Sequence, residues 1–334
     1  GYTLIMAETS LGRMTRKSPV GAFGNFGKSR FISLGGWINA IIPILIVPYY
    51  SVIGGWVIKY LIEYFSGHSK ALAGDTYFTS FISNGISTEI CFLIFTLFTL
   101  GIIYAGVRNG IERVSKFMMP ILIVLSLIIA VYSVTRPGAI EGVKYFLVPN
   151  FEHFSWMTVV SAMGQMFYSL SIAMGILITF GSYMKKDTSI EKSTENVEIF
   201  DTAIAIMAGL MIIPAVFAFS GGDAATLKSG PALMFITIPK VFANMGFGTA
   251  IGIVFFLLVL FAAVTSSIAL TESAVSTFED ELHWSRRKST VFMGVIMILL
   301  GTLSCLGYGP LVDFKILGMQ FLDFFDFLTN SVMM

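Results

Sequence analysis

The sequence predicts an all-α protein that crosses a membrane several times, and three observations support this fold class. Hydrophobic residues make up 55% of the 334 residues and charged residues only 12%, whereas soluble domains carry about 25% charged residues. Apolar runs recur along the whole chain, and most of them reach the roughly 20 residues that a helix needs to cross the hydrocarbon core. These runs lack the alternating pattern of a membrane β-barrel. We therefore expect a single transmembrane domain over residues 1–334.

The apolar runs divide the chain into complete and partial spans. Partial spans lie at residues 1–11 and 319–334, so the chain is expected to be a fragment at both ends. Segment 221–247 contains a Gly-Pro pair followed by a helical pattern, and it is either a lid-like loop on the outer face or an ordinary connection. The complete spans are expected at residues 36–61, 88–107, 117–135, 157–184, 197–219, 247–278 and 289–308.

Basic residues are concentrated in every second loop. The loop after the first partial span holds five Lys and Arg residues, and the loops around residues 108–116, 185–192 and 286–288 hold three each. The alternate loops hold seven in all. Because positively charged loops face the cytoplasm, we expect these basic loops there, in a multi-pass protein of the cell (inner) membrane.

Composition and motifs exclude several classes of function. A net charge of +1 gives no electrostatic basis for binding nucleic acid. The sequence contains no HExxH, G-x-S-x-G, P-loop or dinucleotide fingerprint. Cys91 and Cys305 lie inside apolar runs and form neither a disulfide framework nor a zinc spacing. We therefore expect a protein that is not an enzyme and whose partners are a small molecule and the lipid bilayer.

Polar and small residues interrupt the middle of the fourth complete span, at Gln165, Ser169, Ser171, Ala173 and Gly175. Backbone groups in lipid must be hydrogen-bonded, so a helix can break there only where it lines a polar cavity. Broken ends would offer N–H groups to an anion and carbonyl groups to a cation. The alternative is an intact helix whose serine hydroxyls bond back to the preceding turn.

A second polar group lies in the sixth complete span. Ala262, Thr265 and Ser266 are spaced i, i+3 and i+4, so they share one helical face. The carbonyl of the first and the hydroxyls of the other two could present three neutral oxygens to a small, hard cation. The alternative is a close helix–helix contact made by small residues.

Two acids and a tyrosine pair lie in or near apolar runs, where polar groups are costly and usually functional. Glu8 could satisfy backbone groups freed by a broken neighbouring helix. Asp201 could supply negative charge to a buried cation, or it could be a solvated acid near the cytoplasmic end. A phenol of Tyr49-Tyr50 could bond a substrate carboxylate, or it could pack against a neighbouring helix.

These stretches occur in an order that resembles the neurotransmitter:sodium symporter family, in its bacterial amino-acid branch. The resemblance implies an inverted-repeat helical bundle of the bacterial leucine transporter type, lacking the first helix and the C-terminal helices. It also implies sodium-coupled symport of an amino acid by alternating access. The matching stretches are Gly12-Arg13 after Glu8, Tyr49-Tyr50, Gly110-Ile111-Glu112-Arg113 with Met119-Pro120, residues 164–175, 230–242 and 262–267, and Glu279-Asp280-Glu281.

The resemblance also implies site residues. One sodium site would use Ala262, Thr265 and Ser266, and the other would use Ser169 and Asp201. Tyr50 would bond the amino-acid carboxylate and close the outer aromatic gate with Tyr168. Asp326, or else Asp323, matches the acid of the outer gate, and Ser182, Tyr183 and Asp280 match the cytoplasmic gate. The implied substrate pocket consists of Ile46, Tyr50, Tyr168, Ser169, Ser171, Met174, Ser266 and Leu270.

The chain departs from the family at its anion site. Chloride-dependent members bind the anion near positions matching Gln165, Ser169, Asp201 and Ala205, with a serine at the last. Here an alanine stands at that position, and an aspartate replaces the usual asparagine at 201. We predict that Asp201 replaces chloride, so that sodium is the coupling ion and chloride is not required.

The pocket residues also suggest the kind of substrate. Ile46, Met174 and Leu270 favour an apolar or aromatic amino acid, while Ala173 in place of a common glycine leaves the pocket size open. The alternative function is a transporter-like receptor or regulator that binds the amino acid without moving it.

Overall fold

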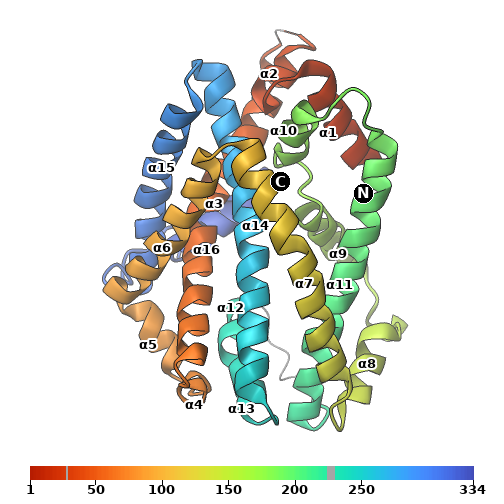
Figure 1. The fold of residues 1–334 in the computed structure, drawn as a ribbon, viewed down its shortest axis with the longest axis vertical. Coiled ribbons are helices and arrows are strands. Elements are labelled where there is room, and N and C mark those ends of the chain that lie inside the picture. Colours follow the sequence, from red (N-terminus) through yellow and green to blue (C-terminus); the bar gives the residue numbers. More distant parts are fainter. Residues whose placement is uncertain (28, 224–229) are drawn as a thin grey trace.

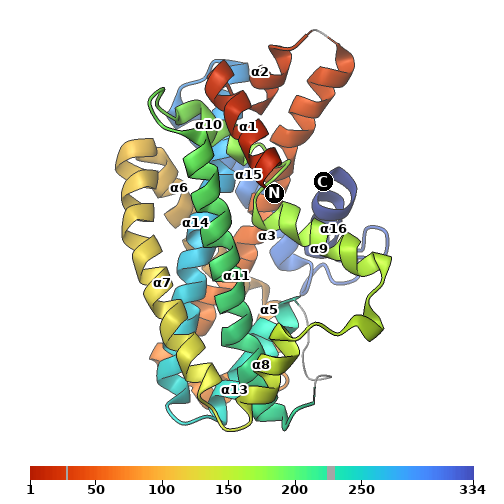
Figure 2. The same cartoon turned by 90° about the vertical axis from the view of Figure 1, so that its right-hand side faces the viewer.

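Long helices dominate the fold and run side by side along one axis (Figure 1). The computed structural model describes residues 1–27, 29–223 and 230–334. Within them, six helices, one of which joins η1 to α7, are long and apolar enough to cross a membrane. Their mean direction is close to the long axis of the molecule (Figure 2). The six are α3 (Arg30–Phe65), α6 (Gly85–Tyr104), η1 with α7 (Val107–Glu112 and Arg113–Val134), α11 (Ile190–Ser220), α14 (Gly248–Leu282) and α15 (Arg286–Leu306).

These helices correspond to six of the seven complete spans expected from the sequence. The fourth expected span, 157–184, differs because it consists of two helices, α9 and α10, with a non-helical connection between them. The shorter elements are α1 (Tyr2–Thr15), α2 (Pro19–Gly24), α4 (Ser69–Leu72), α5 (Tyr77–Ser83), α8 (Ala139–Leu147), η2 (Phe151–His153), α9 (Trp156–Ser169), α10 (Ile176–Tyr183), α12 (Gly230–Ala232), η4 (Leu233–Thr237), α13 (Ile238–Ala243), α16 (Phe321–Phe327) and η5 (Leu328–Met333).

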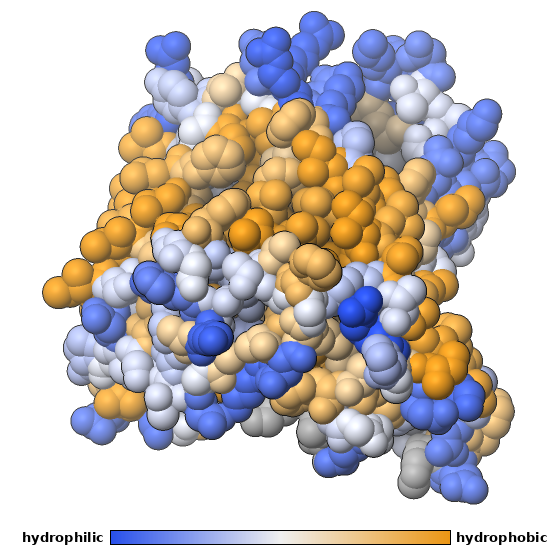
Figure 3. Space-filling model, turned by 60° about the horizontal axis from the view of Figure 1, so that its bottom comes forward, coloured by the Kyte–Doolittle hydropathy of each residue, from blue (hydrophilic) through white to orange (hydrophobic). Residues whose placement is uncertain are grey.

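The surface of this helical bundle is the one expected of a membrane protein. Figure 3 shows a belt of apolar residues above a more polar end of the molecule. Leu97, Phe98 and Val131 are more than half exposed on α6 and α7, although each is strongly hydrophobic. Large apolar side chains on the outside of long helices are stable in lipid and would be unfavourable in water.

The basic loops gather at one end of the bundle. The junctions α1–α2, α6–α7, α10–α11 and α14–α15 all lie toward the upper end of Figure 1, while α4, α8 and α13 lie at the lower end. Because basic residues are concentrated in every second loop, these loops are expected at the same end of the bundle, as the structure has them. The segment expected as a lid, 221–247, forms α12, η4 and α13 at the lower end, and its residues 224–229 lie outside the described residues.

Two features of the packing position the site. Helix α3 lies at the centre of the bundle, with Ile46, Tyr49 and Trp56 almost completely buried. Helix α10 packs tightly on α1, because Gly181 has no side chain at the contact. A Cβ atom added there would lie 2.4 Å from the carbonyl oxygen of Thr9. Two helix backbones can approach this closely only where small residues face each other.

Candidate functional site

The connection between α9 and α10 is a break in the membrane helix. Helix α9 ends at Ser169, and residues 170–175 leave the helical path before α10 begins. Ser171 and Ala173 adopt left-handed backbone angles, with φ of 56° and 63°, a conformation that costs about 1–3 kcal/mol for residues other than glycine. Of the two alternatives that the sequence left open, the structure shows the broken helix.

A distant acid stabilises this break. The carboxylate oxygen Oε1 of Glu8 on α1 accepts a hydrogen bond from the backbone N–H of Ala173, at 2.8 Å. That N–H lies in a turn without a helical partner, and an unpaired N–H inside a membrane protein would be unfavourable. Glu8 therefore has the backbone-capping role that the sequence suggested.

We expect Glu8→Leu to destabilise the full-length protein by about 1–3 kcal/mol, because it leaves the Ala173 N–H without an acceptor. Glu8→Gln is the matched control, since its amide oxygen can still accept that hydrogen bond. Thermal unfolding in detergent measures both variants. Equal destabilisation by the two substitutions would show that the carboxylate charge, and not the hydrogen bond, is what matters.

A cavity of about 440 Å³ opens beside the break. Helix α3, helix α14, the end of α9 and the connection 170–175 form most of its wall. All eight residues predicted for the substrate pocket line it, and Met119, Gln165, Ile176, Thr265 and Ala269 complete the lining. Its size and its mainly apolar wall with a few hydroxyl groups are typical of a site for one small molecule.

The predicted sodium-site residues lie at the edge of this cavity. Ala262, Thr265 and Ser266 line a second cavity of about 590 Å³, and the last two also line the first. The Thr265 hydroxyl donates its proton to the carbonyl oxygens of Phe261 and Ala262, both at 3.0 Å. Because a hydroxyl has one proton and two lone pairs, the Thr265 oxygen can still act as a cation ligand. This set of neutral oxygens suits a hard cation.

The residues of the other predicted sodium site are also brought together. The Ser169 hydroxyl on α9 donates a hydrogen bond to Asp201 Oδ1 on α11, at 2.6 Å. Asp201 lines the second cavity together with Ala262 and Thr265, and Gln165 lines the first. A carboxylate therefore stands next to the position proposed for the anion. Within the described ranges, no three His, Cys, Asp or Glu side chains cluster as in a transition-metal site.

The acid predicted for the outer gate, Asp326, is hydrogen-bonded to a tyrosine of α3. Asp326 Oδ1 accepts hydrogen bonds from Tyr49 Oη at 3.2 Å and from Asn330 Nδ2 at 2.6 Å. Tyr50 lies on the cavity wall with Tyr168. The other candidate acid, Asp323, accepts a hydrogen bond from Tyr308 at 3.1 Å. Asp326 is therefore bonded to the α3 residue that directly precedes Tyr50, which lines the cavity with Tyr168.

The residues predicted for the cytoplasmic gate are each held by a polar contact. The backbone N–H of Ser18 donates to Asp280 on α14. Arg16 donates to the carbonyl oxygen of Ser182 at 2.8 Å. The Tyr183 hydroxyl donates to Glu272 Oε1 at 2.7 Å. These contacts join α1, α2, α10 and α14 at the basic end of the bundle.

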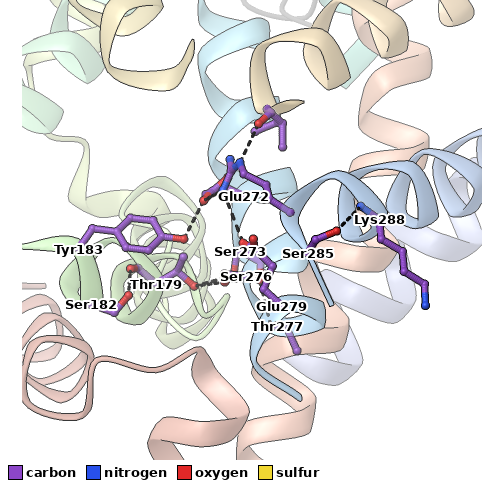
Figure 4. Close-up of polar contacts among 12 residues, drawn as sticks. Thr179, Ser182, Tyr183, Glu272, Ser273, Ser276, Thr277, Glu279, Ser285 and Lys288 are labelled. Atoms are coloured by element: carbon purple, nitrogen blue, oxygen red, sulfur yellow. Dashed lines mark hydrogen bonds and ion pairs between the residues drawn. The ribbon is translucent and has the colours of Figure 1, made fainter. Parts of the chain in front are cut away.

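Sequence reasoning missed the acid at the centre of this network. Glu272 is completely buried on α14, and the guanidinium of Arg286 on α15 binds both of its oxygens, at 2.9 and 2.5 Å. Arg286 also donates to the carbonyl oxygen of Ile103 at 3.0 Å and lies 3.6 Å from Glu279. Figure 4 shows Tyr183 directed at Glu272 from the neighbouring element. An acid inside the expected span 247–278 was the signal that could have revealed this residue.

Comparisons with known proteins agree with this geometry. The sequence model described as the sodium:neurotransmitter symporter family (SNF) matches residues 81–334. The uncharacterized sodium-dependent transporter YhdH of Bacillus subtilis (strain 168) is 35% identical, over 100% of this chain and 74% of its own length. An uncharacterized sodium-dependent transporter of Haemophilus influenzae is 31% identical, over 100% of this chain and 75% of its own length.

A solved structure is similar over the same length. The crystal structure of MhsT in complex with L-phenylalanine superposes with a TM-score of 0.87 at 35% sequence identity, covering 100% of this chain and 76% of that one. The chain thus spans about three quarters of the length of the relatives that it matches.

Proposed function

Since this chain belongs to the sodium:neurotransmitter symporter family, whose members are membrane transporters and not enzymes, we propose that it takes part in sodium-coupled symport of a small apolar or aromatic amino acid. Transport would follow alternating access, in which the cavity opens first to one side of the membrane and then to the other. The coupling ion is sodium, and chloride is not required. The family assignment rests on these relatives, whereas the inverted-repeat arrangement, the substrate and the roles of the site residues are proposed.

One observation carries this proposal. The broken connection between α9 and α10 and the oxygen-bearing face of α14 border the same cavity, which is about 440 Å³ in volume. The N–H and C=O groups freed by a broken helix can bind the charged groups of an amino acid, while neutral oxygens close by hold the driving cation. Binding of the ion would therefore help to complete the substrate site.

The lining supports an apolar or aromatic side chain in the substrate. Ile46, Met174 and Leu270 are nearly buried and face the cavity, so burial of an apolar group against them would be favourable. The structurally similar MhsT was solved with L-phenylalanine. Tyr50 would bond the carboxylate of the substrate, and Ser169, Ser171 and the other polar groups would fix its orientation.

Uptake into proteoliposomes tests the function. The full-length protein should accumulate labelled phenylalanine or leucine when sodium flows inward, and it should exchange label in counterflow without a gradient. The alternative, a receptor or regulator with the same fold, would bind the label in a sodium-dependent manner and give neither accumulation nor counterflow.

We expect Thr265→Val to raise the sodium concentration for half-maximal uptake about 10-fold to 100-fold. The substitution removes one of the oxygens proposed to coordinate the sodium ion and keeps the shape of the side chain. Thr271→Val is the matched control. Thr271 lies on the same helix, is fully buried, and donates to a backbone carbonyl in the same way, at 2.7 Å, but it lines neither cavity. An equal effect of the two substitutions would contradict the sodium-site assignment.

A further inference from the structure

A separate apolar groove lies between α6 and α7. Its volume is about 560 Å³, and it shares no lining residue with the two cavities described above. Phe95, Met118 and Val264 form a buried floor, and Phe98 and Phe117 stand on the rim. In Figure 1, α6 and α7 meet near the upper end and diverge below it, with α14 behind them.

The rim of this groove faces outward within the apolar belt. Phe98 is 53% exposed and Phe117 is 67% exposed. Both side chains belong to helices long and apolar enough to cross a membrane, so the medium that surrounds them is the hydrocarbon of the bilayer. A concave apolar surface that opens toward lipid can accept an acyl chain along its length.

A basic side chain stands at one end of the groove. Arg113 is the first residue of α7 and lines the groove one helical turn from Phe117. It lies at the α6–α7 junction, in one of the basic segments that the sequence predicts on the cytoplasmic side. In the part of the chain that the structure describes, no hydrogen bond or ion pair engages its guanidinium, whereas neighbouring Lys116 is paired with Glu112 at 2.7 Å. The forked guanidinium group matches the oxygens of a phosphate.

We propose that this groove binds one anionic phospholipid of the cytoplasmic leaflet. An acyl chain lies on the floor formed by Phe95, Met118 and Val264, and the phosphate of the headgroup accepts hydrogen bonds from Arg113. The arrangement follows from charge complementarity, because the cytoplasmic leaflet carries anionic lipid and the free cation stands at headgroup level. A neutral apolar ligand would use the floor and leave the guanidinium unpaired.

Quenching of a tryptophan by brominated phospholipid tests this site. The reporter is introduced by Phe117→Trp in the full-length protein, and the control reporter by Val124→Trp, which is exposed on the same helix outside the groove. The native tryptophan signal is subtracted with protein that lacks either reporter. Vesicles contain brominated phosphatidylglycerol or brominated phosphatidylcholine. At the groove reporter, we expect brominated phosphatidylglycerol to bind about fivefold more tightly than brominated phosphatidylcholine, as judged by quenching, which is the difference expected for one basic side chain at a membrane surface. At the control reporter, we expect the two lipids to quench equally.

Two charge variants identify the residue responsible. In the groove-reporter background, Arg113→Gln should abolish the preference, whereas Arg108→Gln should preserve it, because Arg108 is a basic residue of the same junction that does not line the groove. Equal quenching by the two lipids at the groove would overturn the proposal, as would an unchanged preference in Arg113→Gln. Absence of quenching by either lipid would also overturn it, since it would mean that another part of the protein fills the groove.

Discussion

Arg286→Ala is expected to lower the free energy of unfolding by about 3–5 kcal/mol, because it leaves the fully buried carboxylate of Glu272 without its ionic partner. The same substitution also removes the hydrogen bond from the guanidinium to the carbonyl oxygen of Ile103. Thermal or denaturant unfolding of the full-length protein in detergent, with tryptophan fluorescence as the signal, measures the loss.

The double variant Arg286→Ala with Glu272→Gln separates charge from packing. A neutral amide at position 272 should recover a substantial part of the lost stability, since an amide is far less costly to bury than an unpaired carboxylate. Arg287→Ala is the matched control, because the neighbouring guanidinium lies over the ring of Tyr104 and, among the residues that the structure describes, pairs with no buried acid. A loss in Arg287→Ala as large as in Arg286→Ala would contradict the importance of the buried pair.

Asp201→Asn is expected to reduce sodium-driven uptake in chloride-free medium at least about tenfold, because it removes the negative charge proposed to offset the bound cation. Addition of chloride should restore part of the uptake in this variant, since an anion could then occupy the vacated position beside Ser169. Initial rates in proteoliposomes, with gluconate or chloride as the only anion, provide the measurement.

The unmodified protein should transport equally well in gluconate and in chloride. Glu195→Gln is the control for Asp201→Asn, because Glu195 lies on the same helix, is exposed and lines neither cavity. Uptake by the unmodified protein that collapses without chloride would rule out the proposed role of Asp201.

The fold class was predictable because the bilayer imposes its thickness on the sequence. The six long helices lie where apolar runs of sufficient length lie. The break after Ser169 could not be decided in the same way. Serine and glycine residues permit both an intact and a broken helix, and the partner that stabilises the break, Glu8, is 165 positions away from Ala173 in the chain. The residues around the break do not reveal so distant a partner, and Glu8 could be suggested only because an acid is unusual in an apolar run.

The candidate site was predictable in its members and less so in its contacts. The resemblance to a family collected eight pocket residues that do line one cavity, and their roles stay a prediction. It gave no partner for Asp326, which the structure pairs with Tyr49, because the rotation of α3 about its axis, which decides where consecutive residues about 100° apart point, is fixed by tertiary packing. The position of Glu272 inside an apolar run was visible in the sequence, but its partner Arg286 lies 14 residues away and is paired with it only by the fold.

The interruption at residues 170–175 has a mechanical consequence. A continuous helix holds its two halves in line, whereas residues 170–175 leave the helical path and two of them adopt left-handed backbone angles. Helix α10 packs closely against α1 where Gly181 faces Thr9, whereas α9 is joined to α10 through residues 170–175. Ser171 and Met174 of this connection line the cavity, so a molecule bound there contacts the segment that sets the angle between α9 and α10.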